Sequence, residues 1–208
     1  MDSAIITGRN SVIEALKAGR SVTRIYITAG KDSQPLLRIR SMAREKGVPV
    51  EPVSADVMRR HARGTHHQDV VAFAAAVAFA DLDEVLSEVQ AKGDVPFLIL
   101  LDGIEDVHNL GAVIRTAECA GAHAVLVPKR RSAPVNETVG KTSAGAVEYM
   151  PVVRIGNTAS FLKKLKKQGF WVIGADMDGE TDYFHSSLTG PLVLVIGSEG
   201  KGISRLVR

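Results

Sequence analysis

Hydrophobic and polar positions in the first part of the chain switch between the helical and the strand period. Apolar residues recur at helical spacing over 10–17, and Gly19 ends this predicted helix. Residues 22–28 alternate and are rich in β-branched side chains, which predicts a strand. A basic helix, a short strand, a further helix and an apolar strand-like segment are predicted in turn at 34–46, 48–53, 54–61 and 67–79. We therefore expect residues 1–78 to form a small α/β domain.

A predicted helix over 81–92 follows this segment. Asp81 is a favourable N-cap residue, and Gly93 is suited to end the helix. We expect residues 79–94 to link two domains.

Between residues 95 and 208, wholly apolar runs alternate with helical segments. The run at 97–101 (FLILL) is typical of a strand that is covered on both faces. Further strands are predicted at 124–127, 151–154, 171–175 and 192–196, and helices at 109–121, 138–148 and 160–168. This alternation with short connections predicts a parallel sheet with helices on both faces.

In such sheets, ligands bind in the loops beyond the carboxyl ends of the strands. Three of the predicted loops, 102–109, 175–179 and 197–202, are rich in Gly, Asp or Glu. We expect the functional site in these loops.

Composition narrows the class of protein. The chain has 208 residues, of which 45% are hydrophobic and 24% charged, enough for a globular core. A formal net charge of +3 permits a nucleic-acid partner without requiring one. The lone Cys119 excludes an internal disulfide and a cysteine-based zinc site, and we expect it to be a small core residue. Without a long apolar run or a signal-peptide core, we expect a cytoplasmic protein that does not associate with membranes.

Two other kinds of site are disfavoured. Gly140-Lys141-Thr142 lacks the glycine that a P-loop needs at the position of Val135, and no dinucleotide fingerprint is present. The histidines at 61, 66 and 67 have no carboxylate at a ligand spacing, so we expect no metal site.

Two basic segments have different predicted roles. The four lysines between 163 and 167 are typical of a solvated helix face. Lys129, Arg130 and Arg131 directly follow a predicted strand and are better candidates for binding a phosphate backbone.

The most informative stretch is 101–121, whose pattern predicts a strand, an acidic loop and a helix. Asn109 is the predicted N-cap, and Arg115 is expected to project toward the loop. On these residues alone, Asn109 can equally be a plain cap and Arg115 an ion-pair partner, for example of Glu118. The functional interpretation gains weight because Gly-Ser-Glu-Gly at 197–200 is expected at the same sheet edge.

These two motifs resemble those of the SpoU (TrmH) family of RNA ribose 2'-O-methyltransferases, whose SPOUT fold is an α/β trefoil knot. Residues 109–116 (NLGAVIRT) are similar to the family's first motif, N-x-G-x-x-x-R-[ST]. Residues 192–202 (LVLVIGSEGKG) are similar to the second, an apolar strand followed by G-x-E-G-x-G, and 141–152 resembles the connecting segment. The segments 8–16 (GRNSVIEAL) and 66–72 (HHQDVVA) resemble the L30e-like RNA-binding domain that often precedes the SPOUT domain.

The resemblance implies an L30e-like domain at 1–78 that binds the RNA substrate, and a SPOUT methyltransferase domain at 95–208 that forms a homodimer. The loop before the first motif is most similar to the bacterial subgroup that methylates a guanosine of 23S rRNA. Methylation of a tRNA ribose, an RNA-binding protein without catalysis, and an unrelated nucleotide-binding α/β enzyme remain as alternatives.

The implied cofactor is S-adenosylmethionine. The residues that match the family's cofactor-binding positions are Ile196, Gly197 and Ser198, with Ala175 on the neighbouring loop. The methyl group would pass to a ribose 2'-hydroxyl, so the protein must orient the two groups and handle the hydroxyl proton.

The implied catalytic residues are Arg115, Asn109 and Glu199. A guanidinium is a poor proton acceptor, so we expect Arg115 to clamp the adjoining phosphate and stabilise a developing alkoxide. Asn109 would orient Arg115 or the ribose, and Glu199 would hold Arg115 or Asn109 in place. RNA contacts are expected from Arg9 in the first domain and from the basic run at 129–131.

The sequence departs from the family in two places. Val107 stands where the family usually has proline, which we expect to loosen the loop. The third motif, a Ser-Leu-Asn-x-Ser loop and its helix, is not found up to Arg208. Because that motif threads the knot and completes the cofactor pocket in the family, we expect the C-terminal part of the knot to be missing from this chain.

Overall fold

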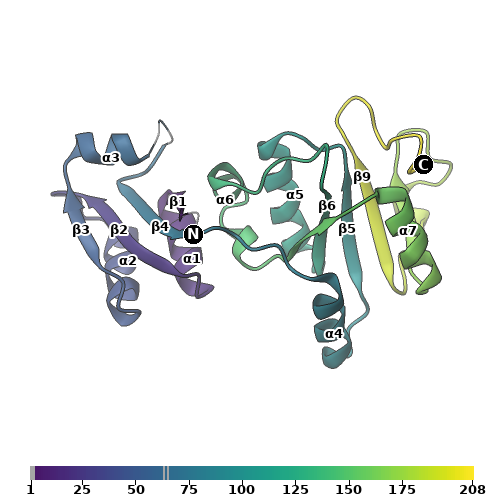
Figure 1. The fold of residues 1–208 in the computed structure, drawn as a ribbon, viewed down its shortest axis with the longest axis horizontal. Coiled ribbons are helices and arrows are strands. Elements are labelled where there is room, and N and C mark those ends of the chain that lie inside the picture. The colour runs from purple at the N-terminus through teal and green to yellow at the C-terminus, as the bar shows by residue number, and fades with distance from the viewer. Residues whose placement is uncertain (1–2, 63, 65) are drawn as a thin grey trace. The chain divides into compact units, whose positions relative to one another are not determined.

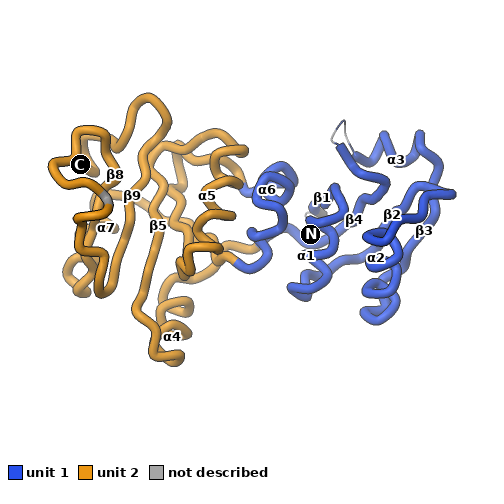
Figure 2. The backbone as a smooth tube through the Cα atoms, turned by 180° about the vertical axis from the view of Figure 1, so that it is seen from behind, with its two compact units in different colours: residues 1–77, 135–149 blue, residues 78–134, 150–208 orange. Residues whose placement is uncertain are grey.

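The computed structural model describes residues 3–62, 64 and 66–208 (Figure 1). Contacts between Cα atoms divide the chain into two compact units (Figure 2). Unit 1 comprises residues 1–77 together with 135–149, and unit 2 comprises 78–134 together with 150–208. The domain boundaries expected from the sequence stay a prediction, but the contacts add that the segment 135–149 packs with unit 1.

Unit 1 contains a four-stranded sheet in the order β1-β4-β2-β3. Its strands are β1 (Ser3–Thr7), β2 (Val22–Thr28), β3 (Val50–Val53) and β4 (Val70–Ala75). β4 runs antiparallel to β1 and β2, whereas β2 and β3 are parallel. The helices α1 (Arg9–Lys17) and α2 (Gln34–Glu45) share one core with the sheet, and α3 (Ala55–His61) packs in a second.

The short strand β1 was not predicted from the sequence. Its five residues pair along their whole length with β4, from Ser3 opposite Ala75 to Thr7 opposite Val71. The strand therefore depends on a partner far away in the sequence, which a local hydrophobic pattern does not reveal.

The helix predicted at 138–148 is broken in the structure. α6 (Glu137–Thr142) is followed by the 3-10 turn η1 (Ala146–Glu148). Between them, Ala144 and Gly145 have left-handed φ angles of 53° and 90°, which a continuous helix does not allow. A Cβ on Gly145 would lie 2.7 Å from the Cβ of Glu14, so glycine lets this segment approach α1 closely.

A largely buried ion pair anchors the same segment within unit 1. Arg20 Nη1 donates to Glu148 Oε1 at 2.5 Å, and only 12% and 6% of the two side chains are exposed. Burial raises the pKa of the Glu148 carboxyl, and the Arg20 guanidinium opposes that shift.

Unit 2 contains a five-stranded sheet in the order β7-β6-β5-β9-β8, and each neighbouring pair is parallel. The strands are β5 (Phe97–Asp102), β6 (Ala124–Pro128), β7 (Val152–Ile155), β8 (Trp171–Ala175) and β9 (Leu192–Gly197). The parallel α/β sheet predicted from the apolar runs is confirmed.

Helices α4 (Leu82–Lys92) and α7 (Thr158–Lys167) share one core cluster with alternate residues of β5, including Leu98 and Leu100. The intervening residues point to the opposite face of the sheet, and α5 (Val107–Cys119) is the remaining helix of unit 2. As predicted, Asp81 caps α4, because its carboxylate accepts hydrogen bonds from Asp83 N and Glu84 N. The short 3-10 turn η2 (Tyr183–His185) lies between β8 and β9.

The expectation that Cys119 lies in the core is wrong. α5 buries Leu110, Ile114 and Ala117, and helical geometry places Cys119 on the other side, where it is exposed.

Within residues 3–62, 64 and 66–208, none of the helices has the length and apolar character that a membrane crossing requires.

We predict that Glu148→Ala lowers the free energy of unfolding by about 3 kcal/mol, because it leaves the Arg20 guanidinium buried without its carboxylate. The exposed pair Asp56–Arg59 provides the control, since Asp56→Ala should cost less than about 1 kcal/mol. Urea denaturation followed by circular dichroism measures both variants. Equal, small effects would show that the buried pair does not anchor this segment.

Candidate functional site

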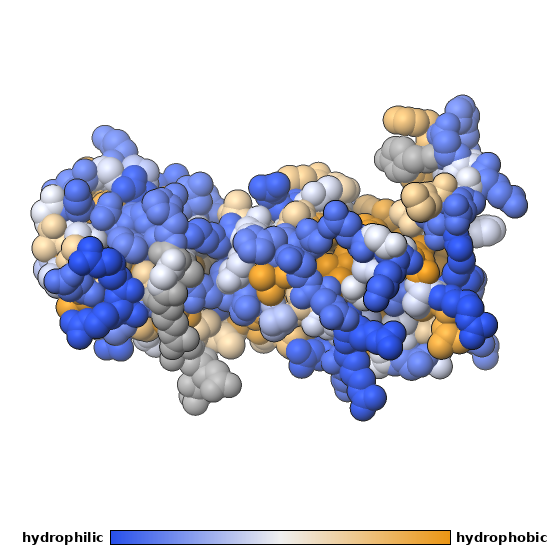
Figure 3. Space-filling view, turned by 90° about the horizontal axis from the view of Figure 1, so that it is seen from above, coloured by the Kyte–Doolittle hydropathy of each residue, from blue (hydrophilic) through white to orange (hydrophobic). Residues whose placement is uncertain are grey.

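The carboxyl ends of the five strands of unit 2 meet at one edge of the sheet, as expected for a parallel arrangement (Figure 1). Figure 3, the view from above, shows apolar surface between hydrophilic residues on the half of the picture that holds unit 2. Two clefts, both lined wholly by residues of unit 2, open at this edge.

The first cleft, here named the Asn109 cleft, has a volume of about 510 Å³. It brings together the first turns of α5 and the turn after β9. Its lining residues are Gly103, Ile104, Glu105, Asp106, Asn109, Ala112, Val113, Gly197, Ser198 and Glu199. Two of the three predicted catalytic residues, Asn109 and Glu199, thus line one cleft although they lie far apart in the sequence.

The register of the sheet explains this meeting. β5 pairs with β9 so that Asp102 lies opposite Gly197, the last residues of the two strands. The loops that carry the two motifs therefore start side by side.

Asn109 is not the N-cap of α5, contrary to the prediction. Asp106 is the cap: its Oδ1 accepts hydrogen bonds from His108 N at 2.6 Å and Asn109 N at 3.2 Å. A carboxylate is as good a cap as an amide and is also favoured by the positive helix end, so the helix begins three residues earlier. As a result, the Asn109 side chain is free to face the cleft.

Val107 is the first helical residue of α5 rather than part of a loop. Proline is well tolerated at this position because the amide hydrogen there has no partner within the helix. Valine in place of the family's proline therefore lies within the helix. The prediction that it loosens the loop is wrong.

The turn after β9 is closed by two backbone hydrogen bonds between Ser198 and Gly202. A Cβ on Gly197 would lie 2.1 Å from the carbonyl carbon of Gly202, so only glycine fits at this position. This close approach sets where Ser198 and Glu199 stand at the rim of the cleft.

Arg115 lies outside the lining of the Asn109 cleft. Its side chain is exposed, and on the surface of α5 it lies next to Ala112, which lines the cleft, and about 120° around the helix from Asn109. Among the described residues, no hydrogen bond or ion pair joins Arg115 to Glu199 or to Glu118. Its catalytic role stays a prediction.

The predicted cofactor residues lie at the ends of β8 and β9. Ala175 pairs with Ile196 across these strands, and Gly197 and Ser198 follow directly. Gly197 and Ser198 line the Asn109 cleft, whereas Ile196 and Ala175 do not. Beyond Ala175, Arg208 Nη2 binds Asp176 Oδ1 at 2.6 Å and Asp178 Oδ2 at 3.1 Å.

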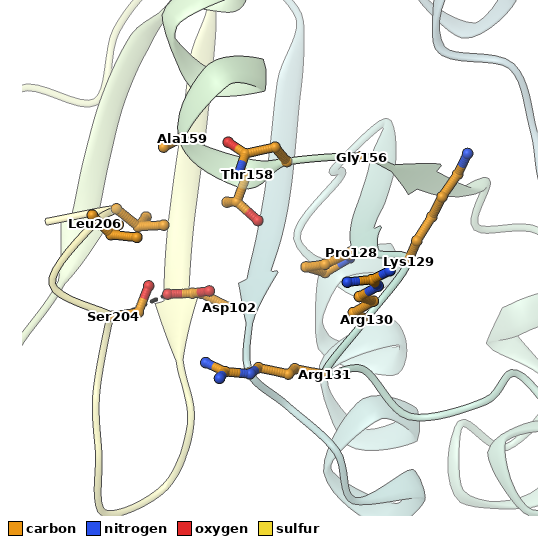
Figure 4. Close-up of a pocket in the computed structure, with 13 residues that line it drawn as sticks. Asp102, Pro128, Lys129, Arg130, Arg131, Gly156, Thr158, Ala159, Ser204 and Leu206 are labelled. Atoms are coloured by element: carbon orange, nitrogen blue, oxygen red, sulfur yellow. Dashed lines mark hydrogen bonds between the residues drawn. The ribbon is translucent and has the colours of Figure 1, made fainter.

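The second cleft, here named the basic cleft, has a volume of about 450 Å³ (Figure 4). It includes all three predicted cations of the turn after β6. Its lining residues are Asp102, Gly103, Pro128, Lys129, Arg130, Arg131, Gly156, Asn157, Thr158, Ala159, Ser204, Leu206 and Val207.

Arg9, the predicted RNA contact of the first domain, is engaged in contacts within unit 1. Its Nε donates to Gln68 O at 2.9 Å, and its Nη2 forms an ion pair with Asp69 at 3.3 Å. Gln68 and Asp69 both have left-handed φ angles, of 50° and 65°. Arg9 thus holds an unusual turn, and a contact with RNA stays a prediction.

The sequence analysis expected the site in the loop 102–109 but did not single out Gly103, Glu105 and Asp106 within it. A glycine at the end of an apolar strand followed by a good N-cap residue was the available signal. Within the described ranges, no group of three or more His, Cys, Asp or Glu residues is placed to hold a metal ion.

The two motifs that resemble those of SpoU-type RNA methyltransferases thus meet at the carboxyl edge of one parallel sheet. The model of the SpoU rRNA Methylase family matches residues 96–208, more than half of the chain. That of the RNA 2'-O ribose methyltransferase substrate-binding family matches residues 5–80.

Individual proteins agree with these matches. YacO of Bacillus subtilis (strain 168), assigned by name to the TrmH family of tRNA/rRNA methyltransferases, is 38% identical over 98% of this chain and 81% of its own length. A Staphylococcus haemolyticus protein with the same family name is 39% identical over 100% of this chain and 83% of its own. The SpoU methyltransferase AviRb from Streptomyces viridochromogenes, solved in complex with AdoMet, has the same fold: its TM-score is 0.79 at 23% identity, over 99% of this chain and 77% of that chain. The protein belongs to the SpoU family of RNA methyltransferases.

We predict that Gly197→Ala lowers the free energy of unfolding by about 2 kcal/mol or more, because the new methyl group overlaps the backbone at Gly202. Gly156→Ala is the matched control, since a Cβ there meets no atom within 4 Å. Urea denaturation measures both. Equal stability of the two variants would contradict the tight turn described above.

Proposed function

We propose that the protein transfers a methyl group from S-adenosylmethionine to a ribose 2'-hydroxyl of structured RNA in the cytoplasm. The substrate that the resemblance favours is a guanosine of 23S rRNA, with a tRNA ribose as the alternative. The observation that carries this proposal is the meeting of Asn109, from the first family motif, and Glu199, from the second, in one cleft. The AdoMet complex of AviRb and the match to the substrate-binding family support it.

The residues at the ends of β8 and β9 fit this cofactor. Ala175 is small and exposed, and its neighbour Ile196 is half-buried. The turn that begins at Gly197 has a backbone fixed by the two hydrogen bonds between Ser198 and Gly202. A small apolar surface with a few fixed backbone polar groups is typical of a cofactor site. Bound there, S-adenosylmethionine would supply an electrophilic methyl group on a sulfonium.

The Asn109 cleft suits a hydroxyl and a cation better than a phosphate. Glu105, Asp106 and Glu199 line it, and their negative charges favour a sulfonium nearby and oppose a phosphate. We assign Asn109 to hydrogen-bond the ribose. The Glu199 carboxylate would accept the proton that the hydroxyl loses when its oxygen takes the methyl group.

We further propose that Arg115 acts on the RNA bound to a second copy of the chain, in a homodimer formed through unit 2. The side chain of Arg115 is exposed and does not line its own Asn109 cleft, which supports this proposal. Unit 2 also exposes large apolar side chains suited to an interface, namely Trp171, Met177, Phe184, Leu188 and Leu206. In this arrangement the guanidinium clamps the phosphate beside the target ribose and stabilises the developing alkoxide.

The proposed reaction predicts transfer of tritium from methyl-labelled S-adenosylmethionine to total RNA that lacks its native modifications. Nucleoside analysis should give 2'-O-methylguanosine, and separation of rRNA from tRNA identifies the substrate class. Asn109→Ala and Glu199→Gln should each lower the rate by about 100-fold or more, since each removes a group that handles the hydroxyl. Lys163→Ala, a change on the exposed face of α7, should leave the rate unchanged. RNA binding without any transfer would favour the non-catalytic alternative.

An experiment with mixed dimers tests whether Arg115 of one chain serves the site of the other chain. Arg115→Ala and Glu199→Gln chains, each inactive alone, are co-expressed with different tags and the mixed dimer is purified. If Arg115 serves the partner's site, one site of each mixed dimer is intact, and about half of the wild-type rate per dimer returns. A mixed dimer as inactive as its parents, or a protein that stays monomeric in analytical ultracentrifugation, would contradict the shared site.

A further inference from the structure

Three neighbouring cations of the basic cleft have no counter-charge of their own. Lys129, Arg130 and Arg131 are all exposed, and in the described part of the chain none of them forms an ion pair. The carboxylate of the cleft, Asp102, accepts a hydrogen bond from Ser204 N at 2.7 Å. The cleft therefore has a net positive charge, which favours an anionic ligand.

The turn that carries these cations is held at three points. Lys129 N donates to Ile155 O at 2.9 Å, Ser132 Oγ to Pro128 O at 2.5 Å, and Ala133 N to Ile104 O at 2.8 Å. A turn fixed in this way presents its charges with little loss of entropy on binding.

Arg131 has a left-handed backbone, with a φ angle of 56°. Such an angle is uncommon for a residue other than glycine, asparagine or aspartate, and it costs of order 1 kcal/mol or more. In Figure 4, the Arg131 side chain extends from this turn across the cleft toward Asp102, whereas Lys129 points away. The unusual backbone thus aims one guanidinium into the cleft.

The opposite wall is the first turn of α7. The side chain of Asn157 accepts a hydrogen bond from Ser160 N at 2.9 Å. The backbone amides of Thr158 and Ala159, which precede Ser160 and line the cleft, have no acceptor within the helix. These amides add a weaker positive potential to that of the three side chains.

The two clefts differ in the sign of their charge and share one residue. Gly103, without a side chain and with a φ angle of 76°, lines both, directly beyond the end of β5. Carboxylates gather in the Asn109 cleft, whereas cations gather in the basic cleft. An RNA strand that crosses Gly103 would meet a site for its ribose on one side and a site for its phosphate on the other.

We propose that the basic cleft binds a backbone phosphate of the RNA strand whose target ribose enters the Asn109 cleft, with Arg131 as its main ligand. That the bound phosphate belongs to an RNA strand rests on the proposed function. The arrangement sets the register of the strand without reading its sequence, as phosphate contacts do.

Binding of inorganic phosphate tests the site without any methyl transfer. In ¹⁵N-labelled protein, phosphate should shift the backbone amides of Thr158 and Ala159 in a saturable way. Arg131→Asn removes the charge but tolerates the left-handed backbone, so it should weaken phosphate binding about 10-fold. Lys167→Ala removes one cation from outside the cleft and should change binding less than 2-fold, roughly the effect of a distant exposed charge. Equal effects of the two variants, or shifts that spread without saturation over the lysines of α7, would overturn the proposal.

The methyl-transfer assay then shows whether the anion that the basic cleft binds belongs to the RNA or to the cofactor. Arg131→Asn should raise the KM for RNA more than it lowers kcat. Its Kd for S-adenosylmethionine, measured by calorimetry, should equal that of the Lys167→Ala control. A weaker Kd for S-adenosylmethionine with an unchanged KM for RNA would assign the cleft to the cofactor's carboxylate and overturn the proposal. A wild-type protein that binds phosphate as described but transfers no methyl group would contradict the proposed function alone.

Discussion

The parallel pairing of β5 with β9 is the constraint on which the site depends. Its register ends both strands at the same level, with Asp102 opposite Gly197, so two loops that are distant in the sequence begin together. Gly197 then lets the following turn fold back onto the strand, because any side chain there would overlap Gly202. The chemistry of the cleft follows from this backbone geometry, since it brings Glu199 and Asn109 to the same space.

Helix capping and charge separation refine that arrangement. Asp106 caps the first turn of α5, so the side chain of Asn109 has no capping role. The side-chain amide of Asn109 can therefore bind a ligand. The carboxylates lie on one side of Gly103 and the unpaired cations on the other. An RNA strand carries neutral riboses and charged phosphates in strict alternation, so a surface with this alternation of charge can orient the strand before any base is read.

Much of unit 2 could be predicted from the sequence, because its strands are buried on both faces and appear as uninterrupted apolar runs. The exact start of α5 could not, since Asp106 and Asn109 are both good N-cap residues and only the folded loop decides between them. The pairing of β1 and the packing of residues 135–149 on unit 1 depend on contacts between distant segments, which no local pattern encodes.

A crystal structure of the protein with S-adenosylhomocysteine and a short oligoribonucleotide would test the central claim most directly. We predict a ribose hydroxyl within hydrogen-bond distance of Asn109 and Glu199, and a backbone phosphate of the same strand within hydrogen-bond distance of Arg131. A phosphate bound in the Asn109 cleft, or an RNA strand that passes the edge of the sheet without entering either cleft, would contradict the account.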